Sequence, residues 1–327
     1  MEQKLKVAVI GCGGISGCHL EAYSKNPNVE IYALCDVNEK NLNRRGDQYH
    51  VERRYTDKDK MLAELQEIDA VSVCTWNAAH AECTIAALNA GKHVLCEKPI
   101  APDSAALGRM VRAARESGRA LMEAMMPAHT PAYRAIRAAM AEIGPVRRAT
   151  LRYCQYSSRY DKFKAGIVEN AFDPTLANGA LMDIGVYCVH AAQLLFGEPE
   201  TVAGTSVFLP GSIDGAGSLL LGYGDKVAEI VYSKITNSAS PSEIEGEGGS
   251  ILIDAISRPR RAELVLRGGA RREIPLGVEF DEMRYEADDF LALLRGARMD
   301  AFLADSEAVT RTLDRARAAM GVDFRRH

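Results

Sequence analysis

Residues 6–16 read KVAVIGCGGIS, and this stretch decides the fold of the first half of the chain. An apolar run typical of a buried strand ends in the glycine-rich GCGG, and a helical pattern follows from Ile15 to Lys25. A glycine turn between strand and helix lets backbone N–H groups approach a pyrophosphate, which the positive end of the helix dipole also attracts. Ser16 is a small residue at the third position of G-x-G-x-x-G. We therefore predict a dinucleotide-binding turn formed by Gly11, Gly13, Gly14, Ile15 and Ser16.

The same alternation of strand and helix continues to about residue 124. The apolar runs VEIYALC, DAVSVC, HVLC and ALMEA are separated by helical segments such as residues 104–117. Strands that are apolar throughout, with helices between them, are typical of a parallel sheet covered on both faces. We predict an α/β Rossmann domain with a doubly wound parallel sheet over residues 1–124.

After Pro131 the pattern changes to extended segments with hairpin turns. One of these hairpins is predicted to turn at Gly224–Asp225. Helical patterns occupy residues 133–143, 282–295 and 305–320. We therefore predict a C-terminal α+β domain over residues 125–327 with a large, mostly antiparallel open sheet that binds substrate and forms oligomers.

Composition points to a small-molecule partner. The chain has 327 residues, 47% of them hydrophobic, and a formal charge of −4 from 40 basic and 44 acidic side chains. The interspersed charges offer no basic stripe for a nucleic acid, and no apolar run at the N-terminus is long enough for a signal peptide or a membrane span. We expect a cytoplasmic protein with neither a nucleic-acid nor a membrane partner.

The cysteines show no zinc spacing and no C-x-x-C pair. Several end strand-like apolar runs, where a thiol acts as a small hydrophobe in a reducing compartment. We expect no metal site. The eight cysteines are Cys12, Cys18, Cys35, Cys74, Cys83, Cys96, Cys154 and Cys188.

Asp36 ends the second predicted strand, 25 residues after Gly11. An acidic side chain at this point accepts hydrogen bonds from ribose hydroxyls and repels a 2′-phosphate, which favours NAD over NADP. The alternative is that Asp36 only starts a turn or caps the helix that begins near Asn38.

Two further segments group polar residues that are hard to explain as structure alone. A predicted strand at residues 94–96 delivers Glu97 and Lys98 at its carboxyl end, where open α/β sheets bind ligands. The segment LANGALMDIGVYCVH carries Asp183, Tyr187 and His190 at spacings that share one helix face. These residues are the candidate catalytic groups.

Four motifs together resemble the Gfo/Idh/MocA family, named for glucose-fructose oxidoreductase and inositol dehydrogenase. They are GCGGIS, the T-x-N-x-x-H of residues 75–80, the AGKHVLCEKP of residues 90–99 and the D-x-G-x-Y of residues 183–187. The resemblance covers nearly the whole chain. It implies a two-domain fold, an NAD cofactor, and a homodimer or homotetramer formed through the C-terminal sheet.

The resemblance also implies roles for single residues. Lys98 is expected to contact the substrate hydroxyl near the nicotinamide, and Tyr187 to transfer the proton. Members similar to inositol dehydrogenase tend to have His at the place of Tyr187, whereas those resembling dihydrodiol dehydrogenases have Tyr. Trp76 departs from the family, where Pro is usual. Further cofactor contacts are expected from Thr75, Trp76, Asn77, His80, Glu97 and Lys98.

The chemistry of hydride transfer is consistent with these roles. A carbinol carbon releases hydride only as its hydroxyl proton leaves, so a base and an oxyanion-stabilising group are needed. A phenol is a poor base at neutral pH, and a nearby ammonium favours the phenolate. We therefore expect Lys98 and Tyr187 to act as a pair, with Asp183 orienting Lys98. The structural alternatives are a core tyrosine, an N-cap at Asp183 and an ordinary helix histidine at His190.

Three functions are compatible with the sequence. The first is an NAD-dependent dehydrogenase or reductase for a sugar, polyol or vicinal diol. The second recycles a tightly held NAD within one turnover, as the resemblance permits for glucose-fructose oxidoreductase and NAD-dependent glycosidases. The third is an NAD-sensing regulatory protein, since the family also contains a transcriptional repressor; the presence of both Lys98 and Tyr187 argues against this.

Overall fold

The computed structural model describes residues 4–279, 283–297 and 300–324, and they form two compact units. The first unit comprises Met1–Met126 and Met283–Ala304, and the second comprises Pro127–Glu282 and Asp305–His327. Helix α10 (Met283–Leu294) therefore belongs to the N-terminal unit, whereas a division at residue 124 assigns it to the C-terminal domain. The reason is packing, because its buried Phe290 and Leu291 share a core cluster with Val7 of the first strand.

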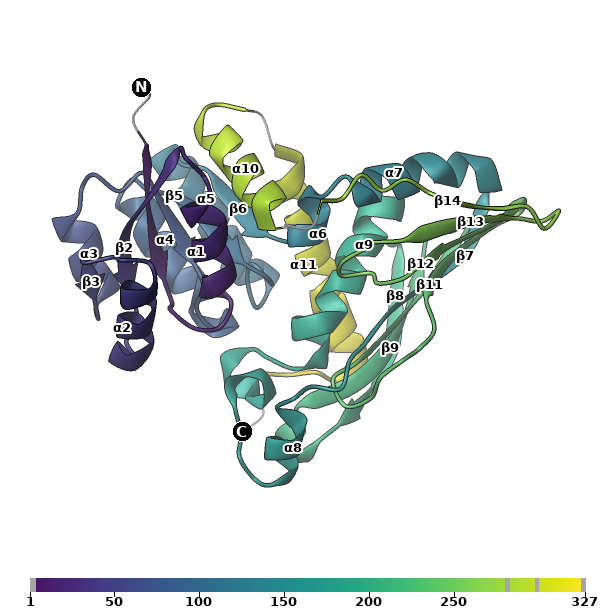
Figure 1. Cartoon of the computed structure of the whole chain (residues 1–327). Coiled ribbons are helices and arrows are strands. Elements are labelled where there is room, and N and C mark those ends of the chain that lie inside the picture. Colours follow the sequence, from purple (N-terminus) through teal and green to yellow (C-terminus); the bar gives the residue numbers. More distant parts are fainter. Residues whose placement is uncertain (1–3, 280–282, 298–299, 325–327) are drawn as a thin grey trace. The chain divides into compact units, whose positions relative to one another are not determined.

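The first unit is built on a six-stranded parallel sheet in the order β3-β2-β1-β4-β5-β6 (Figure 1). One face packs against α3, α4 and α5, and the other against α1, α2 and α10. This is the predicted doubly wound α/β arrangement. The strands are β1 (Leu5–Ile10), β2 (Val29–Cys35), β3 (Arg54–Tyr55), β4 (Ala70–Val73), β5 (His93–Glu97) and β6 (Leu121–Ala124), and the helices before β6 are α1 (Ser16–Ser24), α2 (Glu39–Gln48), α3 (Lys58–Glu64), α4 (His80–Asn89) and α5 (Ser104–Ser117).

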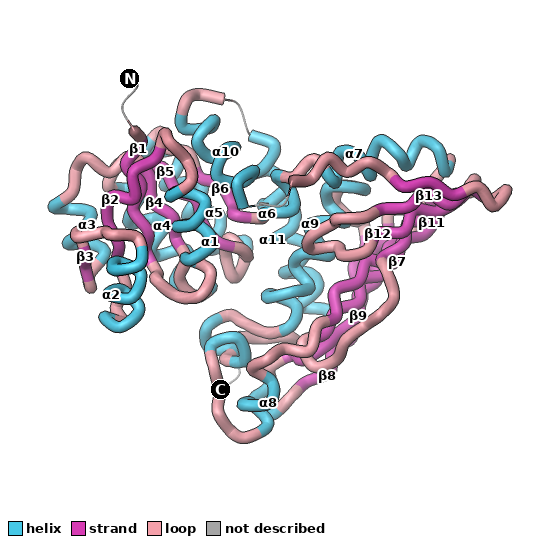
Figure 2. Tube along the Cα trace, in the orientation of Figure 1, coloured by secondary structure: helices cyan, strands magenta, loops and turns pink. Residues whose placement is uncertain are grey.

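The second unit contains an eight-stranded sheet in the order β14-β13-β12-β11-β7-β10-β9-β8, drawn in magenta in Figure 2. Every neighbouring pair is antiparallel except β10 with β7. The predicted hairpin is present, because β9 and β10 are joined through Gly224 with φ +77°. The strands are β7 (Val146–Cys154), β8 (Thr201–Phe208), β9 (Asp214–Gly222), β10 (Val227–Ser233), β11 (Ser242–Gly246), β12 (Gly249–Ile253), β13 (Ala262–Leu266) and β14 (Arg271–Glu273).

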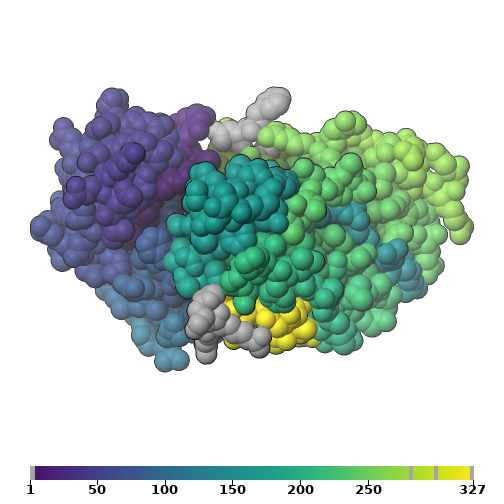
Figure 3. Space-filling view, turned by 90° about the horizontal axis from the view of Figure 1, so that it is seen from below, coloured from purple at the N-terminus to yellow at the C-terminus, as the bar shows by residue number. Residues whose placement is uncertain are grey.

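Helix α9 (Val186–Phe196) and, from Asp305 onward, helix α11 (Asp300–Met320) lie along this sheet in Figures 1 and 2. In Figure 3 the yellow end of α11 lies beside green atoms of the second unit, and the Sδ of Met320 accepts a hydrogen bond from Ser206 of β8. On the strands of this sheet, the exposed side chains between the buried ones include both charged and apolar residues. Arg148 pairs there with Glu229 and Glu245, while Leu220 is 51% exposed.

The remaining helices of the second unit are short or irregular. They include α6 (Met126–His129), α7 (Ala132–Ala139), α8 (Tyr160–Lys164) and the π-helix η5 (Leu181–Gly185) that leads into α9. Among the described residues, one helical stretch, Pro174–Phe196, is long and apolar enough to cross a membrane by composition. Its most apolar window is 72% buried inside the protein, as befits a core helix.

Candidate active site

The glycine turn joins β1 to α1. Gly11 has φ +95°, and a Cβ there would lie 2.5 Å from the carbonyl oxygen of Cys74, so only glycine fits. A Cβ on Gly13 or Gly14 would meet nothing within 4 Å, so open space lies over these two residues. The Ser16 hydroxyl donates to the Gly13 carbonyl at 2.8 Å and closes the turn.

The guanidinium of Arg45, which is not among the residues predicted from the sequence, also supports the turn. The Nη2 of Arg45 in α2 donates to the carbonyl oxygens of Gly13 (3.0 Å) and Gly14 (3.1 Å). A Cβ on Gly17 would lie 2.5 Å from the same nitrogen. Gly17 therefore leaves room for Arg45. The guanidinium in turn fixes the Gly13 and Gly14 carbonyl groups, which point toward it.

Asp36 lies half-buried after the end of β2 and has structural partners. Its Oδ2 accepts the backbone N–H of Cys12 at 2.6 Å, and its Oδ1 accepts that of Asn38 at 2.7 Å. The cap of α2 is Asn38, whose side chain accepts the N–H of Asn41. Asp36 thus starts the turn after β2 and ties it to the glycine turn, but it does not cap the helix.

These residues fit a dinucleotide. The open space over Gly13 and Gly14 lies where backbone N–H groups begin α1, and an acidic side chain stands at the end of the neighbouring strand β2. Ile15 is 38% exposed beside them. The first half of the chain therefore contains the parts that a pyrophosphate and an adenosine ribose require.

The loop after β4 carries the next predicted residues. Trp76 is 41% exposed, whereas Asn77 is buried. His80 is fully buried, with Nδ1 2.9 Å from the Pro99 carbonyl oxygen and Nε2 3.2 Å from that of Thr75. Burial lowers the pKa of His80. His80 therefore joins this loop to the segment after β5.

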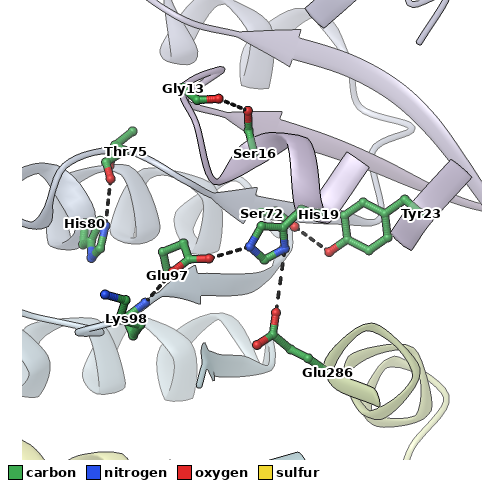
Figure 4. A network of polar contacts seen from close by, with 10 residues as sticks. All are labelled: Gly13, Ser16, His19, Tyr23, Ser72, Thr75, His80, Glu97, Lys98 and Glu286. Atoms are coloured by element: carbon green, nitrogen blue, oxygen red, sulfur yellow. Dashed lines mark hydrogen bonds and ion pairs between the residues drawn. The ribbon is translucent and has the colours of Figure 1, made fainter. Parts of the chain in front are cut away.

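Glu97 and Lys98 stand at the carboxyl end of β5 (Figure 4). The Glu97 carboxylate is buried, with Oε1 2.7 Å from the Nε2 of His19 and Oε2 accepting the backbone N–H of Lys98 at 3.1 Å. Lys98 itself is only partly buried. Glu97 therefore faces inward, and Lys98 is the member of this pair that solvent reaches.

In the second unit, Asp183 lies in η5 and Tyr187 in the first turn of α9, and both are partly buried. The residues at the cap positions of these helices are Ala180 and Gly185, so Asp183 is not an N-cap. The Tyr187 ring packs edge-on against Tyr153, with centroids 5.6 Å apart. His190 differs from the other two candidates because it is only 3% exposed.

The structure adds Lys234, which the sequence analysis missed. Its Nζ lies 2.8 Å from the Oδ2 of Asp183 and donates to the Ala171 carbonyl oxygen at 2.6 Å. The same ammonium stands 4.7 Å from the centre of the Phe172 ring. Lys234 is thus a cation that pairs with Asp183 within the second unit.

Comparison with known proteins identifies both parts of the chain. Residues 5–125 match the GFO/IDH/MocA model described as an oxidoreductase family with an NAD-binding Rossmann fold, and residues 133–252 match the GFO/IDH/MocA C-terminal domain. The chain is 37% identical over 326 residues to scyllo-inositol 2-dehydrogenase (NADP(+)) IolU of Bacillus subtilis, covering 98% of both chains. It is 28% identical over 339 residues to trans-1,2-dihydrobenzene-1,2-diol dehydrogenase of Mus musculus, again covering 98% of both.

Solved structures share the fold at lower identity. The 3-ketoreductase KijD10 from Actinomadura kijaniata aligns with TM-score 0.87 and 24% identity, covering 97% of this chain and 98% of that one. The aldose-aldose oxidoreductase from Caulobacter crescentus aligns with TM-score 0.84 and 22% identity over 97% of both chains. Both alignments extend through the two units.

Proposed function

Since the chain belongs to the GFO/IDH/MocA oxidoreductase family and is an NAD(P)-dependent dehydrogenase acting on CH–OH groups, we propose that it transfers hydride between NAD and a hydroxyl-bearing carbon of a sugar, polyol or vicinal diol. The observation that carries this proposal is the placement of Lys98 at the carboxyl end of β5, with its backbone held by Glu97. Two relatives support the substrate class, because their names denote an inositol dehydrogenase and a dihydrodiol dehydrogenase.

In this proposal the chain's own groups handle the proton and the charge. Tyr187 takes the substrate hydroxyl proton during oxidation and returns it during reduction, while the Lys98 ammonium stabilises negative charge on the substrate oxygen. Asp183, held by Lys234, positions groups around Tyr187. His190 is buried, and a direct role for it stays a prediction.

NAD, when bound, supplies the nicotinamide carbon that accepts or returns the hydride. The pyrophosphate would rest on the turn from Gly11 to Ser16, and Asp36 would meet the adenosine ribose. Thr75 and Trp76 would line the cofactor after β4, while the buried Asn77 and His80 would hold this loop in place. We propose a preference for NAD because a 2′-phosphate would meet the Asp36 carboxylate, although one relative is named for NADP(+).

We further propose that the enzyme is cytoplasmic and forms a homodimer or homotetramer through its C-terminal sheet. The outward side chains of this sheet include Leu220 and Val227 between ion-paired residues such as Arg148 and Glu229. Such a mixture of apolar and charged side chains is compatible with a surface buried against a second copy.

The test is the formation of NADH at 340 nm with inositols, vicinal diols and aldoses, each with NAD or NADP. We expect NADH formation that Lys98→Ala and Tyr187→Phe abolish. The matched controls Lys60→Ala and Tyr55→Phe, which alter exposed ion-pair or hydrogen-bond partners of Glu64, should keep full activity. NAD released only on denaturation, without turnover, would instead indicate internal recycling. Reversible NAD binding without any turnover would favour a sensing role.

A further inference from the structure

A line of buried polar groups runs behind Lys98 inside the first unit (Figure 4). His19 of α1 lies between two carboxylates: its Nε2 is 2.7 Å from Glu97 Oε1, and its Nδ1 is 3.8 Å from Glu286 Oε1. His19, Glu97 and Glu286 are 2%, 6% and 1% exposed. Since water does not solvate these side chains, their polar groups depend on protein partners.

His19 is the cation of this group. Burial alone would lower the pKa of its imidazole, yet contacts with Cys74 and the ion pair with Glu97 together hold that pKa well above its ordinary value. Burial raises the pKa of the Cys74 thiol, and it raises the pKa of Tyr23, one turn further along α1, to about 12. Tyr23 is therefore neutral at pH 7, and the carboxyl groups that face His19 are those of Glu97 and Glu286.

Glu97 connects this cation to the candidate catalytic lysine. One carboxylate oxygen meets His19, and the other accepts the backbone N–H of Lys98 at 3.1 Å. A rotation of the carboxylate would break both contacts. The backbone of Lys98 is therefore tied through Glu97 to α1, and through His19 to Glu286 of α10.

We propose that His19 is a positioning residue for Lys98: clamped between Glu97 and Glu286, it fixes the Glu97 carboxylate and, through it, the backbone from which the Lys98 ammonium reaches substrate. This inference rests on the proposed function, in which Lys98 acts on the substrate oxygen. A purely structural His19 would affect folding stability but neither the turnover number nor its dependence on pH.

The first variant is His19→Gln, which keeps an amide donor for Glu97 but removes the positive charge. We expect kcat to fall tenfold or more, while KM and the Kd for NAD change less than threefold. The backbone amide resonance of Lys98 in the cofactor-free protein should shift, because its charge-assisted hydrogen bond changes. His93→Gln at the opposite end of β5 is the matched control, and it should leave kcat and the Lys98 resonance unchanged.

A second variant, Glu286→Gln, covers the case in which His19→Gln does not fold. Removal of one carboxylate makes it easier for His19 to lose its proton. The alkaline limb of the kcat profile should therefore move to lower pH by at least half a unit, while the stability at pH 6 changes little.

Two results would overturn the inference, and they differ from each other. If Lys98→Ala is inactive but His19→Gln or Glu286→Gln keeps the wild-type kcat and pH profile, His19 does not position Lys98. If Lys98→Ala itself retains activity, the proposed function is wrong at this residue and the inference falls with it.

Discussion

The ammonium of Lys234 lies 2.8 Å from the carboxylate of Asp183. Lys234 directly follows β10 and Asp183 lies in η5, 51 positions earlier in the sequence. Lys234 is 3% exposed in its side chain, and Asp183 is 30% exposed. The Ala171 carbonyl and the Phe172 ring complete the surroundings of the ammonium. The position of Asp183, four residues before Tyr187, is thus set by a strand of the sheet.

Lys234→Met should disturb both stability and catalysis. Because it leaves a carboxylate without its buried cation, we expect a loss of about 3 kcal/mol in the free energy of unfolding, together with a kcat about tenfold lower. Lys226→Met, whose partner Asp225 is exposed, should cost less than about 0.5 kcal/mol. A double-mutant cycle with Asp183→Asn measures the coupling, and strictly additive effects would exclude a functional pair.

Gly17→Ala should weaken cofactor binding although residue 17 lies outside the three-glycine pattern. The new methyl group would displace the Arg45 guanidinium from the carbonyls of Gly13 and Gly14, so we expect the Kd for NADH to rise about tenfold. Gly108→Ala in α5, where a Cβ meets nothing within 4 Å, is the control and should stabilise the protein slightly. Fluorescence titration with NADH measures both. Equal affinities for the two variants would contradict a supporting role for Arg45.

Asp36→Asn should reduce discrimination against NADP. The amide keeps one acceptor oxygen for the two N–H groups of Cys12 and Asn38, and it loses the charge that would repel a 2′-phosphate. We expect the ratio of the two Kd values, NADP over NAD, to fall about tenfold or more. Asp47→Asn, which removes only an exposed ion pair with Arg54, should leave the ratio unchanged. If the ratio is the same in all three proteins, Asp36 does not set cofactor choice.

Asp214→Asn should change how stability depends on pH. Asp214 is 1% exposed and accepts the N–H of Leu181, and burial raises its pKa to about 6 despite that hydrogen bond and the charge of Lys234. Between about pH 4 and pH 6 the folded wild type retains a proton that the unfolded chain releases, so rising pH destabilises the fold by about 3 kcal/mol. The variant lacks this loss. Denaturant unfolding measures the free energy of unfolding at pH 4 and pH 7. From pH 4 to pH 7, the stability of the variant relative to the wild type should rise by about 3 kcal/mol. An equal change in both proteins would refute the raised pKa of Asp214.

The sequence predicted the local features of the fold well. The glycine turn, the hairpin at Gly224, the parallel and mostly antiparallel sheets, and the family were all recognisable, and the structure and the comparisons confirm them. Each of these features depends on residues that are close together in the sequence: the alternation of strands and helices, the spacing of the glycines, and the family motifs. The burial of Lys234 could also have been predicted, because Lys234 continues the alternation of the buried residues Ala228, Ile230 and Tyr232 of β10.

Other parts of the site depend on contacts between distant segments. No pattern near Gly13 indicates that Arg45 supports the turn, since the guanidinium comes from the next helix in the sequence. Glu286 meets His19 across more than 260 residues, and its own surroundings resemble any amphipathic helix. The alternative that Asp183 is an N-cap does not hold for a local reason, because the helix begins before it as a π-helix capped at Ala180.

The return of α10 to the first unit has a consequence for synthesis on the ribosome. The core of the Rossmann sheet lacks Ala287, Phe290 and Leu291 until the chain has grown beyond them, long after β6 has emerged. We expect a chain truncated at residue 126 to expose the apolar side chains that α10 covers, among them Val7 and Tyr23, and to aggregate. On this expectation, the N-terminal unit completes its core only after the chain of the second unit has been made.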